Sequence, residues 1–228
     1  MHQQSSRTLR LAKGAVIAAA YAALTWLAAL AGLAYGPVQF RFSEALTVLP
    51  AFSGAAVPGL TLGCLLGNLL SGYGAYDMVF GTLATLFAAC LTRALRSVRF
   101  HGIPFLAPLP PVVCNALIVG VEITVLNGTG IAPDAFRNFN WILFWGNAAS
   151  VGLGELVICY GLGLPLLMRT QRRCQTLRRF AGPLGGGKLL RRPVCHFRDG
   201  NRHLVSRLSR LIGTGIQLFR RSGYLFGG

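Results

Sequence analysis

Residues 14–34 form a run of 21 amino acids without a charged side chain, directly after a short segment that carries Arg7, Arg10 and Lys13. A helix of that length spans the roughly 30 Å hydrocarbon core of a bilayer. Inside hydrocarbon, the backbone polar groups must be hydrogen-bonded within the segment, so the run predicts a helix. A signal peptide is the alternative, because Ala29 and Ala31 form an A-x-A pattern. We favour a retained helix, since the run exceeds the roughly 7–15 apolar residues of a signal core.

Five further helices follow from the alternation of apolar runs and breaks. We expect them at about 38 to 51–56, at 59–70, at 76–95, at about 109–126 and from 141 to about 168. Gly-Pro, Ser-Gly and multiple Pro positions separate them, as such residues do where helices end. The sequence therefore predicts an all-α membrane protein with six transmembrane helices.

Charge is distributed unevenly along the chain. Only 12% of the 228 residues are charged, against about 25% in soluble domains. Residues 169–228 carry fourteen Lys and Arg against Asp199 alone, which accounts for most of the net charge of +16. We therefore divide the chain into a cytoplasmic N-terminus (1–13), a six-helix domain (14–168) and a basic tail (169–228), and we do not expect the whole chain to bind nucleic acid.

The basic residues also predict the orientation in the cell membrane. If the N-terminus is cytoplasmic, eleven Lys and Arg lie at the inner ends of the predicted helices, while only Arg41 and Arg137 lie outside. Basic residues concentrate in cytoplasmic loops. We therefore expect both termini in the cytoplasm, with Arg41, Glu44 and Asp77 near the outer face and Glu122 about one turn deeper.

Polar side chains gather at helical positions where charge is costly. Glu44, Asp77, Glu122 and Glu155 all lie in or at the ends of predicted helices, and Arg41 can neutralise only one of them. Ionisable groups in hydrocarbon are by default candidates for function. The candidate substrate-binding set is Gln39, Arg41, Glu44, Asn68, Asp77, Asn115, Glu122 and Glu155.

Three uses of these acids are open. Carboxylates that lack basic partners suit a flat heterocycle with several N–H groups, because a carboxylate accepts two adjacent donors side by side. They also suit a proton relay. The structural alternatives are bonds from Asp77 and Glu155 to backbone at helix breaks, and an Arg41–Glu44 pair that only reaches toward the membrane surface.

Small residues recur every four positions in the first predicted helix. Ala15, Ala19 and Ala23 form one series, and Ala18 and Ala22 form a second. Small residues at this spacing allow another helix to approach closely in lipid. We predict a partner interface at these five alanines; an Ala-rich helix without a partner is the alternative.

Catalytic and metal-binding patterns are absent from the sequence. It contains no GxxxxGK[ST] phosphate loop and no HExxH, and its six cysteines include no CxxC pair. Four cysteines lie in apolar runs, where Cys packs as a small hydrophobe. We therefore predict no enzyme activity, no cofactor and no metal, so that any transport must draw energy from a partner or a gradient.

Four stretches, in order, resemble the QueT family of queuosine-precursor transporters. They are GPVQFRFSEALTVLP (36–50), PGLTLGCLLGNLLSG (58–72), LAPLPPVVCNALIVGVE (106–122) and GLGELVICYGLGLPL (152–166). The resemblance covers about residues 10–168. It implies a substrate-binding S component of an energy-coupling factor (ECF) transporter, with a site toward the outer face.

The resemblance also implies partners and a ligand. The partners are one membrane coupling protein and two ATPases, contacted through the small residues of the first helix. The ligand is a 7-deazaguanine base of the queuosine pathway. On this interpretation, Glu44 and Glu122 contact the ligand, Gln39 and Asn115 assist, and Arg41 orients a carboxylate or the ligand carbonyl; Glu155 is a further contact or a structural acid.

The basic tail departs from the family. Residues 181–228 lack a sustained helical pattern and contain two Gly-rich breaks. We expect a disordered extension or a non-native reading frame, because a folded domain would need a better core. Contact with anionic lipid and binding of RNA are the alternatives.

Overall fold

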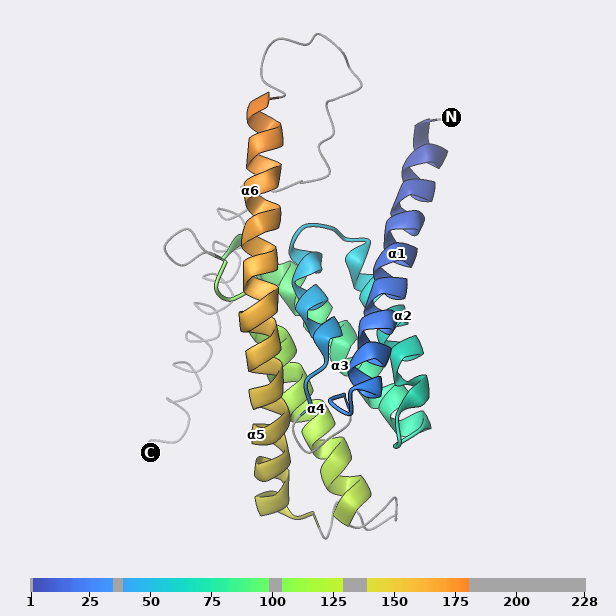
Figure 1. The fold of residues 1–228 in the computed structure, drawn as a ribbon, viewed down its shortest axis with the longest axis vertical. Helices are drawn as coiled ribbons and strands as arrows, with labels where there is room; N and C mark the ends of the chain where they lie inside the picture. The colour runs from blue at the N-terminus through green and yellow to red at the C-terminus, as the bar shows by residue number, and fades with distance from the viewer. Residues whose placement is uncertain (1, 35–38, 99–103, 129–138, 181–228) are drawn as a thin grey trace, which may run out of the picture. The chain divides into compact units, whose positions relative to one another are not determined.

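All the elements that the structure describes are helical. The computed structural model describes residues 2–34, 39–98, 104–128 and 139–180. In chain order, the elements are α1 (His2–Leu30), the 3₁₀ helix η1 (Phe42–Ala51), α2 (Ala56–Gly67), η2 (Asn68–Leu70), α3 (Ala75–Ala94), η3 (Leu95–Ser97), α4 (Leu109–Gly128), α5 (Trp141–Ile158), the π segment η4 (Cys159–Gly163) and α6 (Leu164–Phe180). The all-α prediction is confirmed for these residues (Figure 1).

Four segments are long and apolar enough to cross a membrane. They are Arg7–Leu30, Ala75–Ser97, Leu109–Asn127 and Trp141–Arg173. The second expected helix is shorter than we predicted, with ten residues in η1, and the third, which starts three residues early and ends at Leu70 as expected, is still shorter than the four long segments. At about 2.0 Å per residue, η1 is roughly 20 Å long, and α2 at about 1.5 Å per residue is roughly 18 Å long. Neither reaches the roughly 30 Å of the hydrocarbon core.

The 3₁₀ helix η1 lies at the centre of the bundle. It contacts α1, α2, α3, α5, η4 and α6. A helix with three residues per turn aligns every third side chain. The rows Glu44-Thr47-Pro50 and Ala45-Val48-Ala51 are both buried, while the third row, Leu46-Leu49-Phe52, is half-buried. The sequence pattern of η1 therefore fits an element that is surrounded on nearly all sides.

The first long helix begins before its predicted start, and the last long helix continues beyond its predicted end. Residues 2–13 are helical and continuous with the first span. α1 ends at Leu30, four residues before the expected end at Ala34, and Gly32 follows with a φ of 70° that favours glycine. α6 continues to Phe180, so the first residues of the predicted tail are helical.

A π turn interrupts the last long helix just before Pro165. Pro165 has no N–H and cannot donate to the carbonyl four residues earlier. The wider turn at Cys159–Gly163 comes directly before it. Gly163 faces Val48 and Ala45 of η1, where a Cβ would lie 3.2 Å from Val48 Cγ1. The π segment therefore brings the last helix against the central 3₁₀ helix.

Three glycines on α2 form the contact with α1. Gly59, Gly63 and Gly67 recur every four residues and face Gly14, Ala18 and Thr25 in turn. Such spacing allows two helix backbones to approach closely in lipid. Ala18 and Ala22 of α1 are buried, whereas Ala15, Ala19 and Ala23 are exposed. The two alanine series that we expected at one interface therefore lie on different faces of α1.

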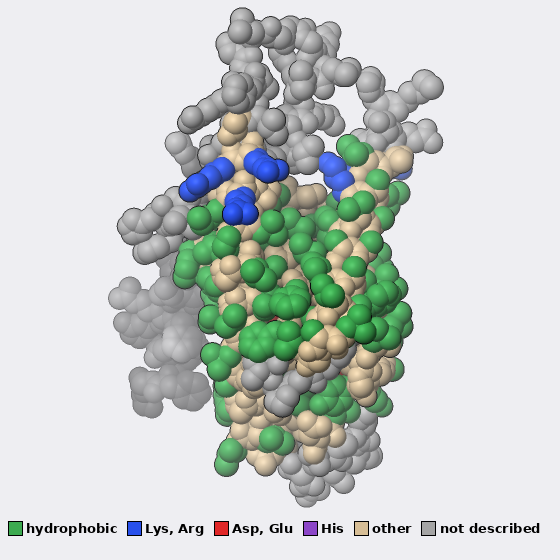
Figure 2. All heavy atoms as spheres, in the orientation of Figure 1, with side chains coloured by type: hydrophobic (Ala, Val, Ile, Leu, Met, Phe, Trp, Pro, Cys, Tyr) green, Lys and Arg blue, Asp and Glu red, His purple; other side chains and the backbone are tan. Residues whose placement is uncertain are grey.

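Basic side chains gather at one end of the bundle. Figure 2 shows Lys and Arg at the end formed by the start of α1 and the C-terminal half of α6, above a face covered by hydrophobic side chains. The described basic residues of these helices are Arg7, Arg10, Lys13, Arg169, Arg172 and Arg173. Basic side chains at one end and hydrophobic side chains along the face below it are the distribution expected for a membrane-spanning bundle whose two terminal helices have their basic ends on the same side.

Gly63→Ala tests the α1–α2 contact. A Cβ at this position would lie 2.7 Å from Tyr21 Cβ and 2.8 Å from the Ala18 carbonyl oxygen. We expect the free energy of unfolding to fall by about 1–3 kcal/mol, as overpacking typically costs, measured as a lower thermal midpoint in detergent. Gly146→Ala on α5 is the matched control, because nothing lies within 4 Å of its Cβ. Equal midpoints for the two variants would contradict the contact.

Candidate functional site

The eight residues of the predicted site are all buried inside the bundle. Each is at most 5% exposed. They come from the segment before η1 (Gln39, Arg41) and from η1 (Glu44), η2 (Asn68), α3 (Asp77), α4 (Asn115, Glu122) and α5 (Glu155). Contacts within the set divide them into groups with different roles.

Arg41 and Asp77 form a buried ion pair, with a distance of 3.2 Å between Nη2 and Oδ2. The Arg41 guanidinium also donates to Asn68 Oδ1 at 3.3 Å and to the Ala34 carbonyl at 3.3 Å. Asn68 in turn donates to the Asp77 carbonyl at 2.8 Å. These bonds connect the segment after α1, the residue before η1, η2 and the first turn of α3. Arg41, Asn68 and Asp77 therefore brace the fold.

Glu44 is held against α1. The Tyr21 hydroxyl donates a hydrogen bond to Glu44 Oε1, and Thr25 donates to Ser43 Oγ at 2.8 Å. Tyr21 and Thr25 lie one turn apart, as do the successive contacts of any helix face. The 3₁₀ helix is thereby fixed to α1 through two polar contacts. The second carboxylate oxygen of Glu44, Oε2, has no hydrogen-bond partner among the described residues.

Glu155 has a protein partner for each oxygen. Asn115 donates to Oε1 at 2.8 Å, and the Cys159 thiol donates to Oε2 at 3.6 Å. Cys159 Sγ also lies 3.7 Å from the Glu44 carbonyl oxygen. Asn115 lies close to the Glu44 carboxylate as well. The Glu44 and Glu155 carboxylates are therefore neighbours, with Asn115 and Cys159 beside both residues.

Three carboxylate oxygens lack a hydrogen-bond partner among the residues that the structure describes. They are Glu44 Oε2 and both oxygens of Glu122. A buried polar atom without a partner costs about 1–3 kcal/mol, and more when it is charged. Glu122 is close enough to Asp77 and Arg41 to interact electrostatically with both. These three oxygens are acceptors that a ligand rich in N–H groups can fill.

Among the described residues, the carboxyl groups of the site outnumber its basic side chains. Arg41 is ion-paired with Asp77, while Glu44, Glu122 and Glu155 are each at most 4% exposed. Within the described ranges, the other basic residues of the helices lie in the N-terminal half of α1, in the last turn of α3, in η3 and in α6. The interior therefore favours a ligand that brings hydrogen-bond donors or positive charge.

The backbone of the buried residue Gln39 packs directly against α5. A Cβ on Gly154 of α5 would collide with the Gln39 carbonyl oxygen. Glycine at 154 therefore lets the segment before η1 lie directly on α5, one residue from Glu155. Close approach of a backbone is one of the few roles that only glycine can fill.

Sequence reasoning missed Tyr21, Thr25 and Cys159. We interpreted the cysteines as packing residues, and Cys64 and Cys159 are indeed buried. Cys159 also donates to Glu155. A spacing of four residues between Glu155 and Cys159 places both on one helix face. This spacing could have predicted that Cys159 lies beside the Glu155 carboxylate. Tyr21 and Thr25 were polar interruptions in an Ala-rich run with the same spacing.

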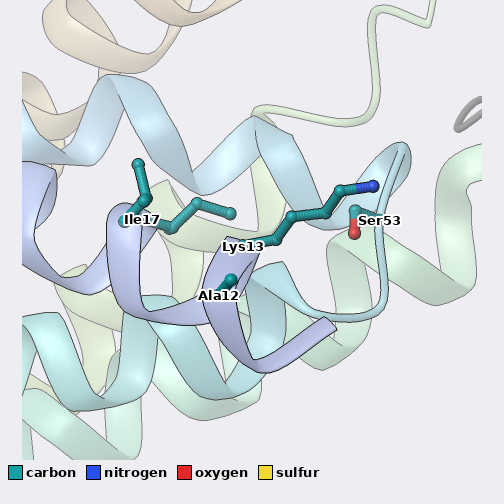
Figure 3. A pocket seen from close by; sticks show the side chains of 5 residues that line it. Ala12, Lys13, Ile17 and Ser53 are labelled. Atoms are coloured by element: carbon teal, nitrogen blue, oxygen red, sulfur yellow. The ribbon is translucent and has the colours of Figure 1, made fainter. Parts of the chain in front are cut away.

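A shallow groove lies away from the buried acids. Its volume is about 350 Å³, and Ala12, Lys13, Val16, Ile17 and Ser53 line it. Figure 3 shows the Lys13 side chain extending toward Ser53, with Ala12 and Ile17 on the same helix. Its lining contains no carboxylate, so it does not have the chemistry of the buried cluster.

Metal and disulfide chemistry was not expected, and the described residues contain no group of three or more His, Cys, Asp or Glu that could hold a metal ion. Cys64, Cys90, Cys114 and Cys159 are free thiols. Cys174 and Cys195 have no described side chain.

Asp77→Leu tests the bracing ion pair. The change leaves Arg41 buried without its carboxylate, and breaking a buried pair in this way costs about 3–5 kcal/mol. We expect a markedly lower thermal midpoint in detergent. The double variant Arg41→Met/Asp77→Leu removes both charges and is expected to recover much of the loss. If single and double variants are equally unstable, the ion pair is not the source of the effect.

The region that contains the buried cluster matches known proteins. The model of the QueT transporter family matches residues 11–172. The Queuosine precursor transporter QueT of Lactococcus lactis subsp. cremoris (strain MG1363) is 36% identical over 83 residues, which cover 36% of this chain and 48% of the relative. The match thus spans about half the length of that relative. No solved structure matches the chain.

The family match includes η1 and all four acids of the buried cluster. It extends over well over half of the 228 residues and contains each candidate membrane span except the first four residues of Arg7–Leu30 and the last residue of Trp141–Arg173. The chain is therefore a multi-pass membrane protein that belongs to the QueT transporter family.

Proposed function

We propose that this protein is the substrate-binding S component of an ECF importer and that it captures a queuosine precursor, a 7-deazaguanine base, at the outer face of the membrane. The family and the name of the lactococcal relative support the transported class. The sequence has no phosphate loop, so ATP hydrolysis belongs to partner subunits in this proposal.

The unpartnered Glu122 carboxylate carries the proposal. It is 4% exposed, and both of its oxygens lack a donor within the described part of the chain. The guanine-type edge of a 7-deazaguanine presents a ring N–H beside an exocyclic amino group. A carboxylate with two available oxygens accepts both in parallel, in the geometry of a bidentate pair. Glu122 therefore suits recognition of the base itself.

Six crossings, with both termini in the cytoplasm, fit the proposal. The end that carries the basic side chains of α1 and α6 (Figure 2) is the inner end, in keeping with the positive-inside rule. Asp77 lies in the first turn of α3, and Arg93 lies in its last turn. Asp77, and Glu122 near it, then lie toward the outer end. In this proposal, η1 and α2 together with the segments that flank them form the second and third crossings.

The partner surface is proposed on α1. Ala15, Ala19 and Ala23 are exposed and form a strip of small side chains against which another helix can pack closely. The groove beside Ala12 and Val16 (Figure 3) adjoins the same helix. Ala18 and Ala22 pack inside the bundle and are excluded from this surface. We propose that the coupling protein of the ECF module contacts this strip.

Titration of the purified protein in detergent tests the ligand. We expect tight binding of a 7-deazaguanine such as 7-aminomethyl-7-deazaguanine and no binding of riboflavin. Glu122→Gln should weaken binding roughly 10- to 100-fold, because a hydrogen bond to a charged group contributes about 1.5–3 kcal/mol. Asp199→Asn is the matched control, since it changes an acid to an amide outside the family match.

No binding by the folded wild-type protein would withdraw the substrate assignment. Equal affinities for the wild-type and the Glu122→Gln proteins would remove Glu122 from the site. A stand-alone proton-coupled transporter would bind the base but would not require ATPase subunits, which the next experiment examines.

Co-purification tests the partner surface. With the coupling protein and both ATPases co-expressed, the triple variant Ala15→Leu/Ala19→Leu/Ala23→Leu is expected to lose the module, because bulky side chains prevent close helix approach. Its ligand affinity should remain unchanged. The matched control is Ala75→Leu/Ala94→Leu/Ala149→Leu, which enlarges three exposed alanines on α3 and α5. Recovery of the module with the α1 variant would place the interface elsewhere.

A further inference from the structure

Glu44 and Glu155 form a pair of buried carboxylates beside each other. Glu44 is 1% exposed and Glu155 is 3% exposed. The two acids interact electrostatically. Asn115 donates to Glu155 and lies close to Glu44. Two neighbouring carboxylates in a low-dielectric interior oppose each other's charge, and Arg41, which acts on both, is already ion-paired with Asp77. A proton or a further cation would therefore stabilise the pair.

The partners of the pair leave one acceptor position. Glu155 receives bonds from Asn115 and Cys159 at its two oxygens. Tyr21 donates to Glu44 Oε1. Glu44 Oε2 is buried and has no donor among the residues that the structure describes. The remaining acceptor therefore belongs to Glu44, whose neighbour is a second buried carboxyl group.

Glu122 differs from this pair in a way that separates two kinds of donor. Both of its oxygens lack partners, which suits two parallel N–H groups on the edge of a flat base. Glu44 offers one oxygen beside a second acid, which suits a single compact cation. A primary ammonium has this form, with a localised charge and three donors.

We infer that the Glu44–Glu155 pair is an ammonium subsite, which selects 7-deazaguanines with an amine on the 7-substituent over those with an uncharged group there. This inference rests on the proposed function. Glu122 recognises the base, which the precursors share, and Glu44 recognises the substituent, in which they differ. Asn115 and Cys159 position Glu155 and so keep the second negative charge beside the subsite.

The test compares two ligands that differ only at this substituent. Affinities of 7-aminomethyl-7-deazaguanine and 7-cyano-7-deazaguanine are measured by calorimetry for the wild-type, Glu44→Gln and Glu122→Gln proteins. The wild-type protein should bind the amine at least roughly tenfold more tightly than the nitrile. Glu44→Gln should weaken the amine roughly 10- to 100-fold and leave the nitrile nearly unchanged. Glu122→Gln should weaken both ligands by a similar factor.

Glu44→Asp keeps the charge and is expected to retain part of the preference for the amine. Glu155→Gln, which removes the second charge, should reduce that preference. These two variants keep the test informative if Glu44→Gln does not fold, and the wild-type comparison needs no substitution at all.

Equal wild-type affinities for amine and nitrile would overturn the inference while leaving the proposed function intact. A Glu44→Gln protein that loses both ligands equally would overturn it as well, because Glu44 would then recognise the shared base. If the wild-type protein binds neither ligand, the inference fails together with the proposed substrate.

Discussion

The buried ion pair between Arg41 and Asp77 is the interaction on which the interior depends. It connects the first turn of α3 to the segment that leads into η1, and Arg41 also holds Asn68 and the Ala34 carbonyl. In hydrocarbon, an arginine must be paired or must reach water. Because Arg41 is 5% exposed, its carboxylate partner determines where the segment lies. The central 3₁₀ helix begins at the next residue, so its position follows from that pair.

The four interior acids differ more in their hydrogen-bond partners than in their burial. Glu44, Asp77, Glu122 and Glu155 are almost equally buried. Asp77 has a cation, and Glu155 has two neutral donors. Glu44 keeps one open oxygen and Glu122 keeps two. A buried carboxylate that is already satisfied contributes to the fold, whereas one that is not is available to a ligand, because its desolvation is compensated only on binding.

Small residues serve two different purposes on α1. One series, with Gly14, Ala18 and Ala22, meets the glycines of α2 or is buried beside them, and the other, with Ala15, Ala19 and Ala23, is exposed. Both series have the same spacing, so periodicity alone predicted an interface at both. Only the glycine series at 59, 63 and 67 shows which face the protein itself uses. The matching repeat on α2 was present in the sequence and could have assigned Ala18 and Ala22 to internal packing.

The sequence by itself determined the fold class, the family, the four long apolar spans and the eight candidate polar residues that are buried. These follow from local properties: the cost of exposing backbone to lipid makes long apolar runs helical, and charge in such runs must face inward. The tertiary structure alone decided that residues 42–51 form a 3₁₀ helix, that Asp77 rather than Glu44 pairs with Arg41, and that Tyr21 and Cys159 belong beside the acids. Such pairing depends on which side chains meet when elements far apart in the sequence pack together. A local sequence pattern does not specify these contacts.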